Sequence, residues 1–214
     1  VFVLEMEAEL GLPALHPGRV MNVELLQSYF TKEQQSFLSL FANAHGWGCR
    51  WDWVLKHLAA NVARQGVQFL TRTRILSSTK HHEKILLELT SSERDKPVEL
   101  FADRLILFSE TSPSGPGGKT HCLEPFFPEK FDTIPTITWF GGTILTTDLT
   151  TLTSADLQIQ RGDGMTELWW RDSPTWVPPH GFIEQCRCEL SPDISHLSFD
   201  SVVSRVHEFV RKTI

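Results

Sequence analysis

The sequence predicts an α/β chain with α+β character overall. In the first half, segments of helical periodicity alternate with strand-like segments, which is the order of elements in an α/β or α+β domain. The second half is rich in threonine, isoleucine and aromatic residues, which is typical of antiparallel strands. With 214 residues, 41% of them hydrophobic, the chain can bury a substantial core.

The first elements are a strand and a pair of short helices. Residues 1–6 read as a short buried strand, and a loop rich in glycine and proline follows. Apolar residues in 23–41 predict one or two helical pieces. We place the break near Thr31, because Thr31 and Gln34 fit a capping box that would begin the second piece.

The clearest helix begins near Trp51. Its apolar residues recur at helical spacing, and Gly66 stands where a C-terminal cap belongs. An extended segment follows at 67–75, and 83–92 and 96–110 predict two or three further strands. The helix therefore leads through a tight glycine turn into a run of strands.

Strands dominate the second half. Residues 133–152 form one strand-like segment, and 155–172 predict a hairpin that turns at Gly162–Gly164. A further strand is expected at 180–190. The chain closes with a helix at 199–213, whose valines and phenylalanine repeat at helical spacing and whose cap would be Ser198 or Asp200.

Composition and charge argue against several classes of protein. A formal charge of −6 and no basic stripe disfavour a nucleic-acid partner. No apolar run approaches the roughly 18 residues needed to span a bilayer. Four irregularly spaced cysteines do not form a disulfide framework, so we expect a reducing, cytoplasmic setting. The candidate zinc ligands lack the paired spacing of a structural site, and we expect no metal. They are His45, Cys49, Cys186 and Cys188.

Three stretches together resemble a known family. "VFVLEMEAELG" has the form of the second strand of a dinucleotide-binding unit, which ends in an acidic residue that accepts both ribose hydroxyls of adenosine. "WDWVLKHLAANVARQGVQFL" and "LFADRLILFSE" follow in the same order as in FAD-dependent oxidoreductases of the amino-acid-oxidase and aromatic-hydroxylase type. The resemblance covers residues 1–110. It implies a partial, Rossmann-like FAD-binding domain.

The resemblance also implies roles for individual residues. Glu5 would bind the adenosine ribose, and the backbone of Ile75 would face the adenine. Arg19 would lie near the cofactor or the substrate mouth. By the logic of the family, 1–110 form a partial FAD/NAD(P)-binding domain, 111–122 a linker, and 123–214 a β-rich antiparallel substrate domain with a C-terminal helix.

The sequence departs from the family in two places. No glycine-rich turn precedes Val1, and Ser109 and Glu110 stand where the family has a small residue and a glycine. We therefore expect a truncated member that lacks about 30 residues of a βαβ unit and binds FAD poorly by itself. A first strand without its neighbour would also expose an apolar edge, which a protein partner or a second copy would cover.

The function implied by the resemblance is hydride transfer from a small organic substrate to flavin. The sequence identifies no catalytic residue. Trp176 and His180, in the stiff loop "SPTWVPPHG", are candidates for the substrate mouth. The segment "RGDGM" at 161–165 resembles a flavin-contacting Gly-Asp, although Gly-Asp-Gly is also a standard hairpin turn. The alternative function is a non-catalytic α+β binding or interaction module that has lost the cofactor.

Overall fold

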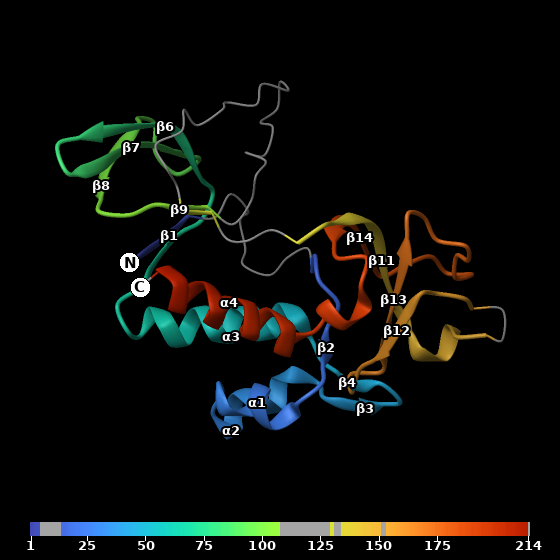
Figure 1. The fold of residues 1–214 in the computed structure, drawn as a ribbon. Coiled ribbons are helices and arrows are strands. Elements are labelled where there is room, and N and C mark those ends of the chain that lie inside the picture. Colours follow the sequence, from blue (N-terminus) through green and yellow to red (C-terminus); the bar gives the residue numbers. More distant parts are fainter. Residues whose placement is uncertain (5–13, 108–128, 131–133, 151–152, 214) are drawn as a thin grey trace. The chain divides into compact units, whose positions relative to one another are not determined.

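The computed structural model describes residues 1–4, 14–107, 129–130, 134–150 and 153–213 (Figure 1). Its mixture of helices and mainly antiparallel sheets confirms the predicted fold class. Contacts group the chain into two units, 1–9 with 66–133 and 10–65 with 134–214. The sequential division into two domains stays a prediction, and the predicted linker at 111–122 lies outside the described residues.

The first unit consists of strands. Three of them form an antiparallel meander in chain order: β6 (Thr73–His81), β7 (Lys84–Ser91) and β8 (Val98–Ala102). Two short pairs are parallel: β1 (Phe2–Leu4) with β5 (Gln68–Leu70), and β9 (Ile106–Leu107) with β10 (Glu129–Lys130). The extended segment predicted at 67–75 is interrupted, because Arg72 adopts a φ of 50° and turns the chain between β5 and β6.

Two short helices follow β2 (Arg19–Val20) near the start of the second unit, as predicted. α1 (Val23–Ser28) is capped by Asn22, and α2 (Lys32–Gln35) begins with the capping box of Thr31 and Gln34. A 3-10 turn, η1 (Ser36–Leu38), ends the helical segment because Ser39 adopts a left-handed φ of 50°. The helix predicted to reach residue 41 therefore stops earlier, and β3 (Phe41–Asn43) begins there.

Two longer helices enclose the core of this unit. α3 (Trp51–Ala63) and α4 (Phe199–Thr213) lie side by side (Figure 1), and the rings of Trp51 and Phe199 meet edge to face. Ser198 is the cap of α4, since its hydroxyl accepts the N–H of Ser201. Buried side chains from both helices and the preceding loops form one cluster: Val20, Leu26, Phe30, Leu38, Cys49, Trp51, Val54 and Phe199. No helix among the described residues has the length and apolar character to cross a bilayer.

A four-stranded antiparallel sheet forms the rest of the second unit. Its strands, in spatial order, are β12 (Leu157–Gln160), β13 (Met165–Arg171), β11 (Ile137–Leu145) and β14 (Glu184–Leu190). A smaller sheet contains β2 (Arg19–Val20), β4 (Gly46–Gly48) and β3. The hairpin predicted at 155–172 is confirmed, with Gly164 in the turn at a φ of +79°.

The register of the large sheet separates two apolar faces. Because side chains alternate along a strand, Trp139, Gly141 and Thr143 of β11 share one face with Trp169 of β13 and Cys186 of β14. On this face, which we call the pocket face, Trp139, Leu157, Ile159, Trp169 and Leu197 form a buried cluster. The opposite face buries Ile144, Leu168 and Trp170.

Candidate functional site

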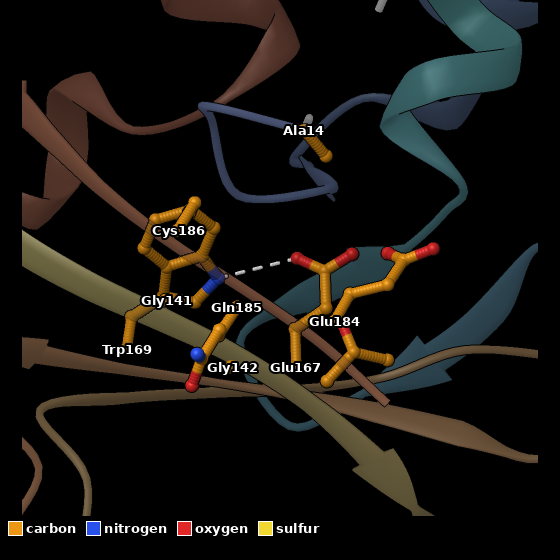
Figure 2. A pocket seen from close by; sticks show the side chains of 9 residues that line it. Ala14, Gly141, Gly142, Glu167, Trp169, Glu184, Gln185 and Cys186 are labelled. Carbon is orange, nitrogen blue, oxygen red and sulfur yellow. Dashed lines mark hydrogen bonds between the residues drawn. The ribbon is translucent and has the colours of Figure 1, made fainter. Parts of the chain in front are cut away.

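A pocket of about 220 Å³ lies on the pocket face of the large sheet (Figure 2). The lining residues come from the loop before β2 and from three adjacent strands: Ala14, Gly141, Gly142, Thr143, Glu167, Trp169, Glu184, Gln185 and Cys186. The pocket thus combines one aromatic ring, two carboxylates and a thiol on a floor of glycine.

Two successive glycines of β11 make this floor. A Cβ at Gly141 would lie 2.6 Å from the Trp169 ring and 2.9 Å from the sulfur of Cys186. A Cβ at Gly142 would point to the opposite face, 2.4 Å from the ring of Phe182, so only the backbone of Gly142 contributes to the pocket. Such close approaches exclude any side chain, which is a common reason for glycine inside a strand. The missing side chain at Gly141 leaves the indole of Trp169 lying against the strand.

Glu167 is a buried carboxylate beside the pocket, with 4% of its surface exposed. Its Oε2 accepts the indole N–H of Trp169 at 3.2 Å (Figure 2). The same oxygen accepts the backbone N–H of Gly18 at 2.9 Å. Its Oε1 accepts a hydrogen bond from Nη1 of Arg161 at 3.2 Å. Burial raises the pKa of Glu167, while Arg161 and the hydrogen-bond donors act in the opposite direction.

Arg161 provides the charge that balances Glu167. It lies at the start of the β12–β13 turn, 8% exposed, and pairs with both Asp163 at 2.9 Å and Glu167 at 3.2 Å. Burial lowers the pKa of Arg161, but the two carboxylates outweigh this effect and raise it. Asp163 also accepts the N–H of Met165 within the turn. The interpretation of "RGDGM" as a hairpin turn is therefore confirmed.

Gly18 connects the loop before β2 to this buried ion pair. A Cβ at Gly18 would lie 2.0 Å from the carbonyl oxygen of Cys49 and 3.0 Å from Oε1 of Glu167. The Gly18 carbonyl in turn accepts the N–H of Cys49 at 2.7 Å. Only glycine allows the loop to approach both β4 and β13, and this approach brings Ala14 to the pocket wall.

The described structure does not test the residues predicted to bind the cofactor. Glu5 lies outside the described residues. Arg19, in β2, donates to the carbonyl oxygens of His45 at 3.3 Å and Ile194 at 2.8 Å. Ile75 belongs to β6 in the other unit, where the β6–β7 register shifts. The cofactor roles of these three residues stay predictions.

The two predicted substrate-mouth residues do not line the pocket either. Trp176 packs against the cluster on the opposite face of the sheet, together with Phe182. His180 is exposed, and its Nδ1 lies 3.8 Å from Oδ1 of Asp148. Glu167, at the centre of the polar groups that the structure gathers, was not singled out from the sequence, although its partners Arg161 and Asp163 belong to the "RGDGM" segment. A charged residue inside the apolar strand "MTELWW" was the available signal.

Comparisons with known proteins identify the class of fold. No protein-family model matches the sequence, and no curated protein matches it. Solved structures of flavin enzymes do match, at identities that establish the fold alone. The resemblance to FAD-dependent oxidoreductases is therefore confirmed at the level of the fold.

Three of these structures span most of the chain. A geranylgeranyl bacteriochlorophyll reductase-like protein from Thermoplasma acidophilum is 15% identical with a TM-score of 0.59, covering 88% of this chain and 59% of its own. A flavoprotein/dehydrogenase from Cytophaga hutchinsonii is 13% identical with a TM-score of 0.54. The match covers 96% of this chain and 70% of the flavoprotein. The p-nitrophenol 4-monooxygenase of Pseudomonas putida DLL-E4 is 10% identical with a TM-score of 0.53. The match covers 89% of this chain and 61% of the monooxygenase. The chain thus spans about 59% of the first of these proteins.

Proposed function

We propose that the chain is part of an FAD-dependent oxidoreductase that oxidises or reduces a small organic substrate by hydride transfer at flavin. The observation that carries this proposal is the shared fold, which extends over 96% of the chain in the flavoprotein/dehydrogenase from Cytophaga hutchinsonii. FAD, when bound, supplies the redox chemistry, and the protein binds and orients the substrate.

The parallel strand pair fits the adenosine half of this cofactor. β1 pairs in parallel with β5, and Glu5 follows directly after the last residue of β1. An acidic residue after the carboxyl end of such a strand accepts the two ribose hydroxyls of a dinucleotide. Glu5 would therefore hold the ribose. The backbone of Ile75 would hold the adenine, as the sequence resemblance implies.

The pocket supports a small, planar substrate. Its volume of about 220 Å³ suits a single ring with few substituents. The hydrogen bond from Trp169 to Glu167 fixes the buried indole, which contributes apolar surface to the pocket wall. Glu184 lines the same pocket and is exposed. Two carboxylates at one pocket favour a neutral or cationic substrate over an anionic one.

The experiment is an FAD titration of the purified full chain, followed by the absorbance of the flavin bands. Uptake with a shifted spectrum, lost in Glu5→Ala and retained in Glu9→Ala, supports the proposal. Glu9→Ala is the matched control because it removes the same charge from a position four residues away in the sequence. A folded chain that takes up no flavin would instead favour the alternative, a binding module without cofactor.

The substrate class is tested separately by quenching of tryptophan fluorescence. Neutral, cationic and anionic single-ring aromatics are compared on the wild type and on Glu184→Gln. We expect the anionic compounds to bind most weakly to the wild type. In Glu184→Gln, the difference in affinity between anionic compounds and the others should be smaller. Stronger binding of the anionic compounds would contradict the proposed role of the two carboxylates.

A further inference from the structure

A threonine lies between two carboxylates at one end of the pocket. In the register of the large sheet, Thr143 of β11 is directly opposite Glu167 of β13 on one side and Glu184 of β14 on the other. Residues that are directly opposite in neighbouring strands point to the same face, with their Cβ atoms about 4.5–5.5 Å apart. All three residues line the pocket, and we call them the polar row.

Thr143 is a buried residue whose hydroxyl has no partner. Only 7% of its surface is exposed, and its hydroxyl makes no hydrogen bond with the described residues. Of the described side-chain atoms, only Nε2 of His57 is both fully covered and without a hydrogen bond. The hydroxyl of Thr143 is therefore not fully covered, and it opens to the pocket. An unpartnered polar group in a buried position costs free energy, so this hydroxyl indicates a ligand that completes its hydrogen bond.

The two carboxylates of the polar row also keep capacity to accept hydrogen bonds. Oε2 of Glu167 accepts two N–H groups, but Oε1 accepts only one, from Arg161. Glu184 is exposed and forms no ion pair or hydrogen bond with the described residues. Because Arg161 balances the charge of Glu167, the unpaired negative charge of the row belongs to Glu184. The row thus offers an oxygen acceptor from each of three strands, together with a negative charge.

We propose that the polar row binds the ammonium group of a primary amine whose single ring lies along the apolar row beside it. That apolar row consists of Trp169, Gly141 and Cys186, two residues further along each strand. An ammonium group has three N–H donors, one for each oxygen of the polar row, and its charge pairs with Glu184. This substrate class rests on the proposed function, because it names the substrate of the same pocket.

The spacing of the two rows suits a compact amine. Two residues of β-strand separate the rows by about 6.6–6.8 Å, so an ammonium group joined to a ring by one carbon reaches both. The pocket volume of about 220 Å³ accommodates a molecule of this size. A neutral alcohol has a single donor for the three acceptors. A quaternary ammonium carries the charge but has no donor for the Thr143 hydroxyl.

The test is isothermal titration calorimetry of the full chain with three compounds that share one ring. Benzylamine, which is protonated at neutral pH, is compared with benzyl alcohol and with benzyltrimethylammonium. We expect benzylamine to bind about tenfold more tightly than either of the others. Equal affinities for benzylamine and benzyl alcohol in the folded chain would overturn the proposal. Calcium chloride that binds more tightly than benzylamine and displaces it would also overturn it, because the row would then be a metal site.

Two substitutions test the polar row itself. Thr143→Val removes the hydroxyl and keeps the shape of the side chain, so benzylamine should bind about tenfold more weakly. Its free energy of unfolding should stay the same or rise, because the hydroxyl has no partner in the protein. A loss of stability with unchanged affinity would mean that the hydroxyl is structural. Thr138→Val, on the opposite face of the same strand, is the control and should keep the affinity.

Glu184→Gln separates charge from hydrogen bonding. It should weaken the binding of benzylamine about tenfold and leave that of benzyl alcohol unchanged, because only the amine is charged. Circular dichroism checks that each variant is folded. Equal affinity of Glu184→Gln and the wild type for benzylamine would contradict the pairing of the ammonium group with Glu184.

Titrations with and without saturating FAD distinguish this inference from the proposed function. A chain that takes up flavin but does not prefer benzylamine would overturn the amine subsite and leave the proposed function standing. A chain that prefers benzylamine but takes up no flavin would support the amine subsite and contradict hydride transfer at flavin.

Discussion

The indole of Trp169 donates a hydrogen bond to the carboxylate of Glu167, two residues earlier in the same strand, at 3.2 Å. Neighbours at this spacing point to the same face of a sheet, so the ring and the carboxylate hold each other in place. The same Glu167 oxygen accepts the N–H of Gly18. One buried carboxylate thus joins a strand, an aromatic ring and a loop from a distant part of the chain.

Replacing this carboxylate should destabilise the second unit. Glu167→Gln removes one of the two carboxylates that pair with the buried Arg161, and we expect a loss of roughly 1–3 kcal/mol in the free energy of unfolding, measured with urea. Adding Arg161→Met removes the buried charge that Glu167 balanced, so the double variant should lose less stability than the sum of the losses of the two single variants. Glu184→Gln, on the exposed side of the pocket, is the control and should stay within about 0.5 kcal/mol. An unchanged stability of Glu167→Gln would mean that Glu167 is protonated in the folded chain.

Gly141→Ala should fill the pocket and strain its walls. The new methyl group would lie 2.6 Å from the Trp169 ring and 2.9 Å from the Cys186 sulfur. Overpacking of this kind costs about 1–3 kcal/mol in the free energy of unfolding. The double variant Gly141→Ala/Cys186→Ala relieves one of the two contacts, so it should recover part of the stability. If it is no more stable than the single variant, the strain comes from the indole alone.

His16 should make the stability of the second unit dependent on pH. Its ring stacks on Trp51 at 4.4 Å between centroids, and burial lowers the pKa of His16 to about 4. Because this pKa is depressed from an ordinary value of 6.5, the folded chain favours the neutral ring. The associated stability is complete above pH 6.5 and is lost as the pH falls towards 4.

The size of this effect and its control follow from the same values. The shift corresponds to about 2–3 kcal/mol between the two ends of the pH range. His16→Phe keeps a stacked ring without a titrating group, so urea unfolding at several pH values should show a flatter profile. His180→Gln replaces an exposed histidine and should leave the profile as in the wild type. If the stability of His16→Phe depends on pH as the wild type does, groups other than His16 cause the loss of stability at low pH.

Asp200 should contribute more to the free energy of unfolding than an ordinary surface carboxylate does. It accepts the N–H of Met21 at 2.7 Å and of Asn22 at 2.8 Å, and so ties α4 to the start of α1. We expect Asp200→Ala to cost about 1–2 kcal/mol in the free energy of unfolding, and Asp200→Asn to cost less because it keeps one acceptor. Equal losses for the two variants would show that charge, not hydrogen bonding, makes the contribution.

Local patterns predicted most of the elements. The capping box at Thr31, the helix from Trp51 and the hairpin with its turn at Gly164 each depend on neighbours within a few residues. Where the prediction was wrong, a positive φ was the cause: Ser39 ended a helix and Arg72 divided a strand, and neither residue type favours that conformation. Asp200 was a candidate cap of α4, yet its carboxylate binds a distant loop.

The candidate site could not be predicted from patterns within short stretches of the sequence. Glu167, Gly18 and Gly141 meet only when strand register and loop position are known, and no periodicity in the sequence links them. The family resemblance pointed to the correct fold because its pattern spans several elements. It could not indicate the pocket, since the resemblance covered residues 1–110 and the pocket consists mainly of β11, β13 and β14.

The division of the second unit between two distant stretches of chain governs the timing of its folding. Gly18 and Glu167 are 149 residues apart in sequence, so the hydrogen bond between them cannot form until the second stretch has been synthesised. At about 5–20 residues per second, the ribosome needs roughly 7–30 s to make that interval. During this time α3 and its apolar neighbours lack α4, so part of the core stays exposed to solvent. The nascent chain is then most prone to aggregate and to bind chaperones.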